Sequence, residues 1–224
     1  MHKHRILSLG DCNTLGVQEC RGNAYPERFA RLLGAEVCNC GFTMSTLREA
    51  KYFFRDFYDA STNIVTLQYG LADSWETFRY SPYVLYYPDN PLRKIARKAV
   101  KKYKKTCRQL GLNNRFGTAP VVPPEQFSRG LAEIIAACRP DTRILLIEIV
   151  PHSDEARTPA ILKYNGLLKK AAASDPRCRL LEAYDLFAGH PDTLYADSTH
   201  INANGHELIA QALVKLYQEG SVLP

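Results

Sequence analysis

Residues 143–150 read RILLIEIV, a short and almost wholly apolar run that ends at Pro151. An earlier segment at residues 63–69, NIVTLQY, has the same character. Short apolar runs rich in β-branched residues are typical of strands buried on both faces, as in parallel sheets. These two segments therefore predict the central strands of an α/β protein.

Weaker strand and helix patterns alternate with these two segments along the chain. Further strands are expected at residues 4–9, 36–39 and 179–183. Apolar periodicity predicts helices at residues 26–33, 46–58, 124–138, 159–173 and 203–218. Such alternation indicates parallel strands joined by crossover helices. We therefore expect a three-layer α/β/α sandwich with a mostly parallel five-stranded sheet.

Length and composition are those of an ordinary globular protein. The chain has 224 residues, of which 46% are hydrophobic and 23% charged, so overall disorder is excluded. We expect a single domain over residues 1–224, with an insertion at about 81–122 that breaks the alternation. No apolar run reaches the roughly 18 residues of a membrane span, and the N-terminus lacks the apolar stretch of a signal peptide. The expected location is the cytoplasm, including a peripheral position at the inner face of the membrane.

Seven cysteines lie at positions 12, 20, 38, 40, 107, 138 and 178. An odd number in a chain without an export signal argues against a disulfide framework. Cys38 and Cys40 have no partners at zinc-site spacing, so buried strand cysteines are the favoured interpretation and no metal is expected.

Glycine-containing polar turns follow the predicted strands, at the edge where open α/β sheets bind ligands. Cys12 follows the first strand, while His200 and Asp197 precede the last helix. A thiol, an imidazole and a carboxylate are the groups of a nucleophilic triad. Cys12 would attack, with its thiol pKa lowered by an imidazole or a helix N-terminus. His200 would take the proton, and Asp197 would hold the ring.

The turns resemble the sequence blocks of the SGNH, or GDSL, hydrolase superfamily. That family has Gly-Asp-Ser after strand one, a glycine after strand two, Gly-x-Asn-Asp after strand three and Asp-x-x-His before the last helix. The matching segments here are Gly10-Asp11-Cys12, Gly41, Gly70-Leu71-Ala72-Asp73 and Asp197-Ser198-Thr199-His200. The resemblance covers residues 6 to about 216 and implies a fold of SGNH or flavodoxin-like type. It also implies an oxyanion hole built from the backbone N–H groups of Cys12 and Gly41, and no cofactor.

Two residues depart from the family pattern. The nucleophilic serine is replaced by Cys12, and the asparagine of the third block is replaced by Ala72. Loss of one oxyanion donor typically costs about 10²–10³ in turnover. Asn13 and Asn39 lie near enough in sequence to replace the missing amide. The chain is most similar to a subset of the family that lacks this asparagine and occurs in polysaccharide biosynthesis.

Other residues near these turns are expected to bind substrate or to support the site. Asp11, Asn13 and Asp73 belong to this group, and for Asp73 hydrogen bonds that tie loops together are favoured. Trp75 and several tyrosines are expected either to pack the insertion or to stack on sugar rings; the tyrosines are those at positions 80, 83, 86 and 87. The histidines at positions 2, 4, 152, 190 and 206 are expected in solvated or capping roles.

The insertion contains a strongly basic segment at residues 92–108, LRKIARKAVKKYKKTCR, with nine Lys or Arg residues. Apolar residues recur in it at three- and four-residue steps, which predicts a helix with an apolar stripe on the domain. The cationic faces predict either a solvated helix or weak binding to an anionic membrane surface or an acidic glycan. Nucleic acid is the weaker option, because no recognition fold accompanies the charge.

The leading expectation is an acyl hydrolase (esterase) or acyltransferase with a Cys-His-Asp triad, acting on an acylated sugar or another small ester. The alternative is a catalytically weak or inert protein of the same fold, which binds a glycan or a partner in polysaccharide biosynthesis. Labelling with an electrophile separates the two, since a poised Cys12 should react faster than the other six cysteines.

Overall fold

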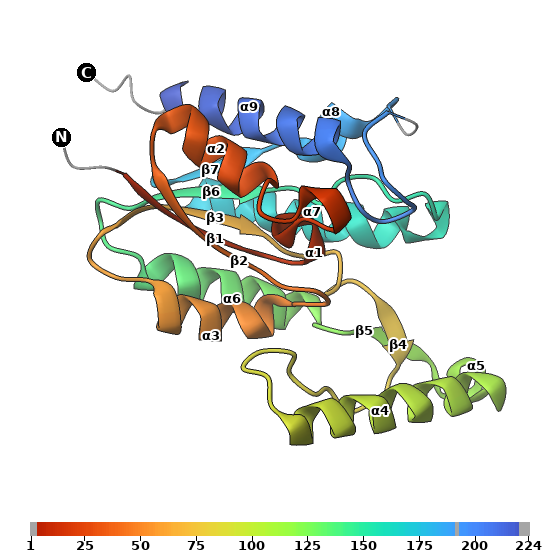
Figure 1. The fold of residues 1–224 in the computed structure, drawn as a ribbon. Helices are drawn as coiled ribbons and strands as arrows, with labels where there is room; N and C mark the ends of the chain where they lie inside the picture. Colours follow the sequence, from red (N-terminus) through yellow and green to blue (C-terminus); the bar gives the residue numbers. More distant parts are fainter. Residues whose placement is uncertain (1–3, 191–192, 220–224) are drawn as a thin grey trace.

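A five-stranded sheet forms the centre of the computed structural model, which describes residues 4–190 and 193–219 (Figure 1). The strand order is β2-β1-β3-β6-β7, and every neighbouring pair is parallel. The strands are β1 (Arg5–Gly10), β2 (Glu36–Gly41), β3 (Thr62–Gln68), β6 (Arg143–Ile147) and β7 (Cys178–Leu181). The five predicted strands are thus confirmed in their positions along the chain.

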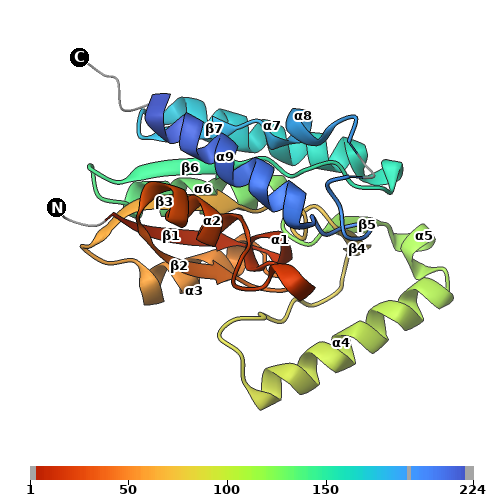
Figure 2. The same ribbon diagram turned by 45° about the horizontal axis from the view of Figure 1, so that its top comes forward.

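Helices cover both faces of the sheet (Figures 1 and 2). One layer consists of α2 (Tyr25–Leu33), α8 (Ala183–Phe187) and α9 (Ala203–Glu219). The other layer consists of α3 (Leu47–Phe57), α6 (Pro124–Ala137) and α7 (Thr158–Ser174). The shorter helical turns are α1 (Cys12–Leu15), η1 (Gln18–Cys20) and η2 (Glu155–Arg157). The predicted three-layer α/β/α sandwich is confirmed.

Strand β3 explains why an apolar run was a reliable signal. Its Ile64 packs into the core beneath α2 and α9, whereas Val65 and Leu67 pack into the core beneath α3, α6 and α7. Successive side chains of a strand point to opposite faces, so a strand covered on both sides needs apolar residues at consecutive positions. The same geometry brings the carboxyl ends of β1, β2 and β3 together at one edge of the sheet.

A separate hairpin interrupts the alternation after β3. Its strands β4 (Glu76–Phe78) and β5 (Thr118–Pro120) pair antiparallel, and the chain between them forms α4 (Pro91–Gln109) and α5 (Leu112–Phe116). Both views place α4 outside the layers of the sandwich (Figures 1 and 2). Within the described part of the chain, no helix has both the length and the apolar character needed to cross a bilayer.

The apolar stripe of α4 does not lie on the domain as expected. Leu92 is 78% exposed, Ile95 is 65% exposed and Tyr103 is 44% exposed, while Cys107 is buried. The physical reason is that α4 contacts β4 and α5 rather than a layer of the sandwich. The expected orientation is therefore wrong, and part of the apolar stripe faces outward.

Candidate active site

The turn after β1 places Cys12 at the start of α1. Asp11 caps this short helix, because its Oδ1 accepts the N–H of Asn13 at 2.9 Å. Cys12 is only 8% exposed. Burial and the Asp11 carboxylate raise the pKa of the Cys12 thiol above its ordinary value. The expected lowering of this pKa is therefore wrong, since α1 has only four residues and offers little dipole against these two effects.

Asp197 and His200 form a pair on the loop before α9. The Nδ1 of His200 lies 2.8 Å from Oδ2 and 3.0 Å from Oδ1 of Asp197. Oδ1 also accepts the N–H groups of Thr199 and His200, each at 2.8 Å. Burial alone would raise the pKa of Asp197, but these hydrogen bonds lower it to about 2. The carboxylate is thus ionised and holds the proton of His200 on Nδ1, which leaves Nε2 to accept a proton.

Asn13 joins the Cys12 turn to the loop of His200. Its Nδ2 donates to the carbonyl of Thr199 at 3.2 Å, and its Oδ1 accepts the N–H of Ile201 at 3.1 Å. Asn13 is only 3% exposed. Because both ends of its amide are engaged, Asn13 positions the backbone on either side of His200, and one of the two N–H groups of its Nδ2 is not used by these contacts. Between these two described loops, no hydrogen bond joins Cys12 Sγ to His200, and such bonds often tighten only when substrate binds.

Gly41 ends β2 directly beside α1. Its N–H donates to Oδ1 of Asn39 at 2.8 Å, and Nδ2 of Asn39 donates to the carbonyl of Thr14 at 2.8 Å. A Cβ at position 41 would lie 2.1 Å from the backbone nitrogen of Leu15. Gly41 is therefore required for the close packing of α1 on β2. Its engaged N–H argues against the oxyanion role expected for it, and the same holds for the amide of Asn39.

The two other acidic candidates are buried in the scaffold. Asp73 is fully buried and accepts the N–H groups of Leu47 at 2.8 Å and Gly70 at 2.9 Å, so it ties the β3–β4 turn to the start of α3. Burial raises the pKa of Asp73 to about 7. Burial likewise raises the pKa of Asp11 to about 6, although the charges of His200 and Arg157 oppose this. Both buried carboxyl groups hold the loops of the site in place through hydrogen bonds to backbone N–H groups.

Met44 carries a signal that the sequence does not reveal. Its φ is +61°, in the left-handed region that costs a residue with a side chain about 1–2 kcal/mol. Such strain clusters at functional sites. Among the described residues, the N–H of Met44 has no hydrogen-bond acceptor. Met44 also lines the same cavity as Ala72, the residue that stands where the family has asparagine.

Arg157 is a second residue that sequence reasoning missed. Its Nη2 donates to the carbonyl of Leu71 at 2.7 Å, and its Cζ lies 4.2 Å from the centroid of the Trp75 ring. Its Nη1 is buried without a hydrogen-bond partner among the described residues. Nothing in the sequence marks this residue, because its contacts come from a turn far away in the chain.

The aromatic residues of the insertion divide between packing and the cavity. Tyr87 stacks on Phe53 with 3.8 Å between ring centroids, and the hydroxyl of Tyr83 donates to Glu49 at 2.9 Å. Trp75 lines the cavity and is 47% exposed. The packing interpretation therefore applies to Tyr87. Tyr83 anchors the loop and also lines the cavity, together with Tyr86 and Trp75.

No cluster of three or more His, Cys, Asp or Glu side chains suited to a metal ion occurs in residues 4–190 and 193–219. The thiols of Cys38 and Cys40 lie 3.7 Å apart on β2. A hydrogen bond between them lowers the pKa of Cys38 to about 7. The direction of this shift favours the thiolate of Cys38, so fast labelling by an electrophile alone would not identify the active site.

Comparisons with known proteins bear on the family and the fold. Residues 8–208 match the model of the GDSL-like lipase/acylhydrolase family. No curated protein sequence matches the chain. The fold is similar to that of a protein from Desulfitobacterium hafniense described as a lipolytic protein of the G-D-S-L family, with a TM-score of 0.66 and 14% identity over 96% of this chain and 99% of that chain.

The fold is also similar to that of the acetylxylan esterase Axe2 from Geobacillus stearothermophilus. The TM-score is 0.63 and the identity 18%, over 95% of this chain and 93% of that chain. Two catalytic mutants of that esterase replace an aspartate and a histidine that lie three positions apart. A GDSL-like lipase from Parabacteroides merdae gives a TM-score of 0.64 at 13% identity, over 96% of each chain.

Proposed function

The chain belongs to the GDSL-like lipase/acylhydrolase family, and on that premise we propose that it hydrolyses an acyl ester through Cys12, His200 and Asp197. The main support is the Asp197–His200 pair, which Asn13 holds against the turn of Cys12. The aspartate and histidine replaced in the catalytic mutants of the acetylxylan esterase have the same spacing. An acylated sugar or another small ester is the proposed substrate.

The raised pKa of Cys12 sets the order of proton transfer. Because the resting thiol is protonated, Nε2 of His200 takes its proton as Sγ bonds to the ester carbonyl carbon, and Asp197 stabilises the imidazolium. The carbon–oxygen bond then breaks, and the leaving alcohol takes the proton from Nε2. A thioester remains on Cys12. Water attacks this thioester with His200 as base, which releases the acid and restores the thiol. An alcohol in place of water would make the same steps an acyl transfer.

Backbone donors are proposed to stabilise the oxyanion of the tetrahedral intermediate. The N–H of Cys12 is one of them, as expected from the family. The N–H of Met44 is proposed as the second, because no described residue accepts this N–H and Met44 lines the same cavity as Ala72. The pair would take the place of the donor that Ala72 cannot provide.

Hydrolysis of 4-nitrophenyl acetate by the purified protein tests this proposal. Cys12→Ala should abolish turnover above the uncatalysed rate, and Cys12→Ser should retain or raise it because the same base serves an alcohol. Cys38→Ala is the matched control, since it removes the more acidic thiol at a site away from His200. Mass spectrometry of the quenched reaction should find an acetyl group on Cys12. Full activity in Cys12→Ala would reject this nucleophile.

A binding protein with little or no catalysis is the second candidate. Three observations favour it: the raised pKa of the Cys12 thiol, the absent hydrogen bond between this thiol and His200 in the described residues, and alanine at position 72. Under this proposal the cleft retains a glycan or a partner without turning it over. Equal ester hydrolysis by the wild type and Cys12→Ala, together with retained glycan binding, would favour this function over the first.

The outward side of α4 supports a further proposal about location. Leu92, Ile95 and Leu110 are 78%, 65% and 67% exposed on a helix rich in lysine. We propose that this side rests on an anionic membrane surface, where apolar side chains enter the interface and lysines meet acidic lipids. Vesicles with and without phosphatidylglycerol test this by co-sedimentation. Leu92→Gln with Ile95→Gln should release the protein; equal binding by the variant and the wild type would reject the proposal.

A further inference from the structure

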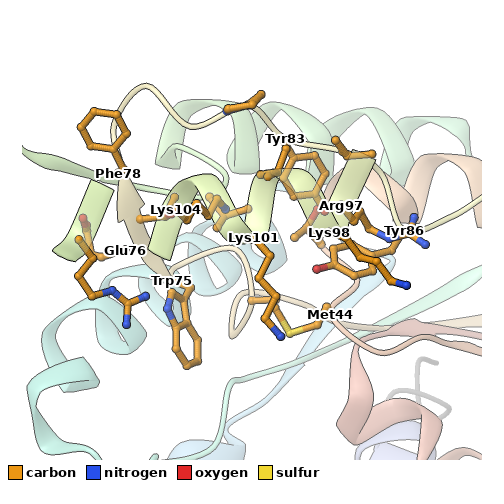
Figure 3. A pocket seen from close by; sticks show the side chains of 18 of the residues that line it. Met44, Trp75, Glu76, Phe78, Tyr83, Tyr86, Arg97, Lys98, Lys101 and Lys104 are labelled. Atoms are coloured by element: carbon orange, nitrogen blue, oxygen red, sulfur yellow. The ribbon is translucent and has the colours of Figure 1, made fainter. Parts of the chain in front are cut away.

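A cavity of about 770 Å³ lies between α4 and the segment that follows β3 (Figure 3). Its volume is within the range of about 300–1,000 Å³ that is typical of small-molecule sites. Met44 and Ala72 line it, whereas Cys12, Asp197 and His200 are not among its lining residues. Figure 3 shows Trp75 and Met44 across from the lysines of α4. The cavity therefore lies between the turn that carries Ala72 and the basic helix of the insertion.

The lining of this cavity carries an excess of positive charge. Six basic side chains from α4 line it, against one acidic side chain, Glu76. Arg97 and Lys94 are paired with Asp89, at 2.6 Å and 3.4 Å. The other four have no acidic partner in the part of the chain that the structure describes; they are Lys98, Lys101, Lys104 and Arg108. Burial lowers the pKa of Lys104, which is the cost of a partly buried cation without a counter-charge.

The unpaired cations are spread out along the helix. From residue 98 to residue 108 an α-helix rises about 15 Å, at about 1.5 Å per residue. Such a row suits a chain of separate negative charges better than one compact anion. Lysine ammonium groups act as point charges and do not require the bidentate geometry that favours arginine at phosphates. Beside them, Trp75 is 47% exposed, and Arg157 lies over one face of its ring, with Cζ 4.2 Å from the centroid.

We propose that this cavity binds an acidic oligosaccharide, whose carboxylates meet the unpaired lysines while one of its sugar rings lies against Trp75. The inference rests on the proposed function in one respect: the bound sugar would present its acyl ester to Cys12. The insertion thereby selects esters on anionic sugars over esters on neutral ones. The cations of α4 that line the cavity are then part of a binding site.

Trp75 provides a direct measurement of binding, because it is the only tryptophan of the 224 residues. Tri-galacturonate is titrated into the Cys12→Ala variant, which keeps hydrolysis out of the measurement, and tryptophan emission is followed. We expect a saturable change whose apparent affinity falls as salt rises. Xylotriose, a neutral trisaccharide, should cause no such change at the same concentrations. Inorganic pyrophosphate serves as the compact anion and should bind more weakly than the trisaccharide acid.

A pair of variants with equal charge change isolates the cavity. In the Cys12→Ala background, Lys101→Gln with Lys104→Gln removes two cations that line it, and the affinity for tri-galacturonate should fall about tenfold or more. Lys102→Gln with Lys105→Gln removes two cations of the same helix that do not line it, and the affinity should stay within about twofold.

Several outcomes would overturn the inference. These are no saturable response to tri-galacturonate, an equal response to xylotriose, tighter binding of pyrophosphate, or an equal loss in the two double variants. Failure of the sugar-binding proposal can be distinguished from failure of the proposed esterase function. If tri-galacturonate binds as expected but the wild type does not hydrolyse the ester, the sugar-binding proposal stands and the proposed catalytic triad is rejected. If the wild type hydrolyses nitrophenyl acetate but does not bind the sugar, the proposed triad stands and the sugar-binding role of the cavity is rejected.

Discussion

Replacement of Asn13 by alanine tests how the candidate site is assembled. The side chain of Asn13 makes two hydrogen bonds to the His200 loop, at 3.2 Å to the carbonyl of Thr199 and 3.1 Å from the N–H of Ile201. Ile201 is fully buried, and Asn13 is 3% exposed. Alanine therefore removes both bonds and leaves a buried N–H without an acceptor.

The expected loss of stability follows from these contacts. A net hydrogen bond contributes about 0.5–1.5 kcal/mol, and a buried donor left unsatisfied costs about 1–3 kcal/mol. Asn13→Ala should accordingly lower the free energy of unfolding by about 2–4 kcal/mol. It should also lower kcat for an ester substrate about 10²-fold, because His200 is no longer held in position relative to Cys12. A displacement of about 1 Å in a catalytic group can reduce the rate by about this factor.

Urea unfolding followed by circular dichroism measures the first quantity, and nitrophenyl acetate hydrolysis the second. Asn204→Ala is the control, since Asn204 is exposed in the first turn of α9, directly after this loop, and its side chain makes only a long 3.5 Å bond to Thr193. A loss of activity without loss of stability would mean that Asn13 acts on the oxyanion instead. Wild-type values for both quantities would refute the positioning role altogether.

Three further predictions concern pKa values and the missing donor. The rate at which iodoacetamide alkylates Cys12, measured on its peptide by mass spectrometry, should keep rising above about pH 8.5, the ordinary thiol pKa. Asp11→Asn should shift this pH profile to lower pH, because it removes a charge that raises the thiol pKa and keeps the helix cap. A plateau of the rate near neutral pH would contradict this prediction. Ala72→Asn should raise kcat for nitrophenyl acetate by several-fold, up to about 10², through one added oxyanion donor; an unchanged kcat in a folded variant would mean that no donor is missing. Burial lowers the pKa of His206 to about 3. Below about pH 6.5 the unfolded chain therefore binds a proton at this residue that the folded chain does not bind. The free energy of unfolding should accordingly fall by up to about 5 kcal/mol as the pH drops from about 6.5 to about 3. His206→Asn, which keeps an acceptor for the N–H of Tyr25, should flatten this dependence in urea titrations, and an equal slope in the variant would show that other groups cause it.

The fold could be predicted because its information is local. The apolar runs at residues 63–69 and 143–150 indicate strands that are buried on both faces, and their alternation with helices indicates that the strands are parallel. The end of β2 was harder to predict. The strand was expected to stop at Asn39, but Cys40 and Gly41 continue it because they pair with Leu9 and Gly10 of β1. That pairing joins segments far apart in the chain and leaves no pattern in either of them alone.

Orientation and burial could not be predicted for the same reason. The periodicity of residues 92–108 correctly predicted a helix, yet it could not show which face meets the protein, because the helix packs on a hairpin whose strands are only three residues long. His206 was expected in a solvated or capping role. It is fully buried, and its Nδ1 accepts the N–H of Tyr25 at 3.1 Å from 181 positions away.

The oxyanion donors illustrate how one residue type can serve two physical needs. A glycine marks either a left-handed backbone or a close approach of two chain segments. At Gly41 the need is close approach, since a side chain would collide with the backbone of Leu15. The left-handed backbone occurs three residues later, at Met44, where no glycine signals it. A sequence pattern anchored on glycine therefore indicates the position that packs, whereas the second N–H proposed as an oxyanion donor belongs to Met44, whose backbone is strained. Together with Ala72 and Arg157, this makes the part of the site that would contact the oxyanion the least predictable from sequence. The two residues proposed to move the proton, Asp197 and His200, lie three residues apart on one loop, and their pairing could be predicted from the sequence.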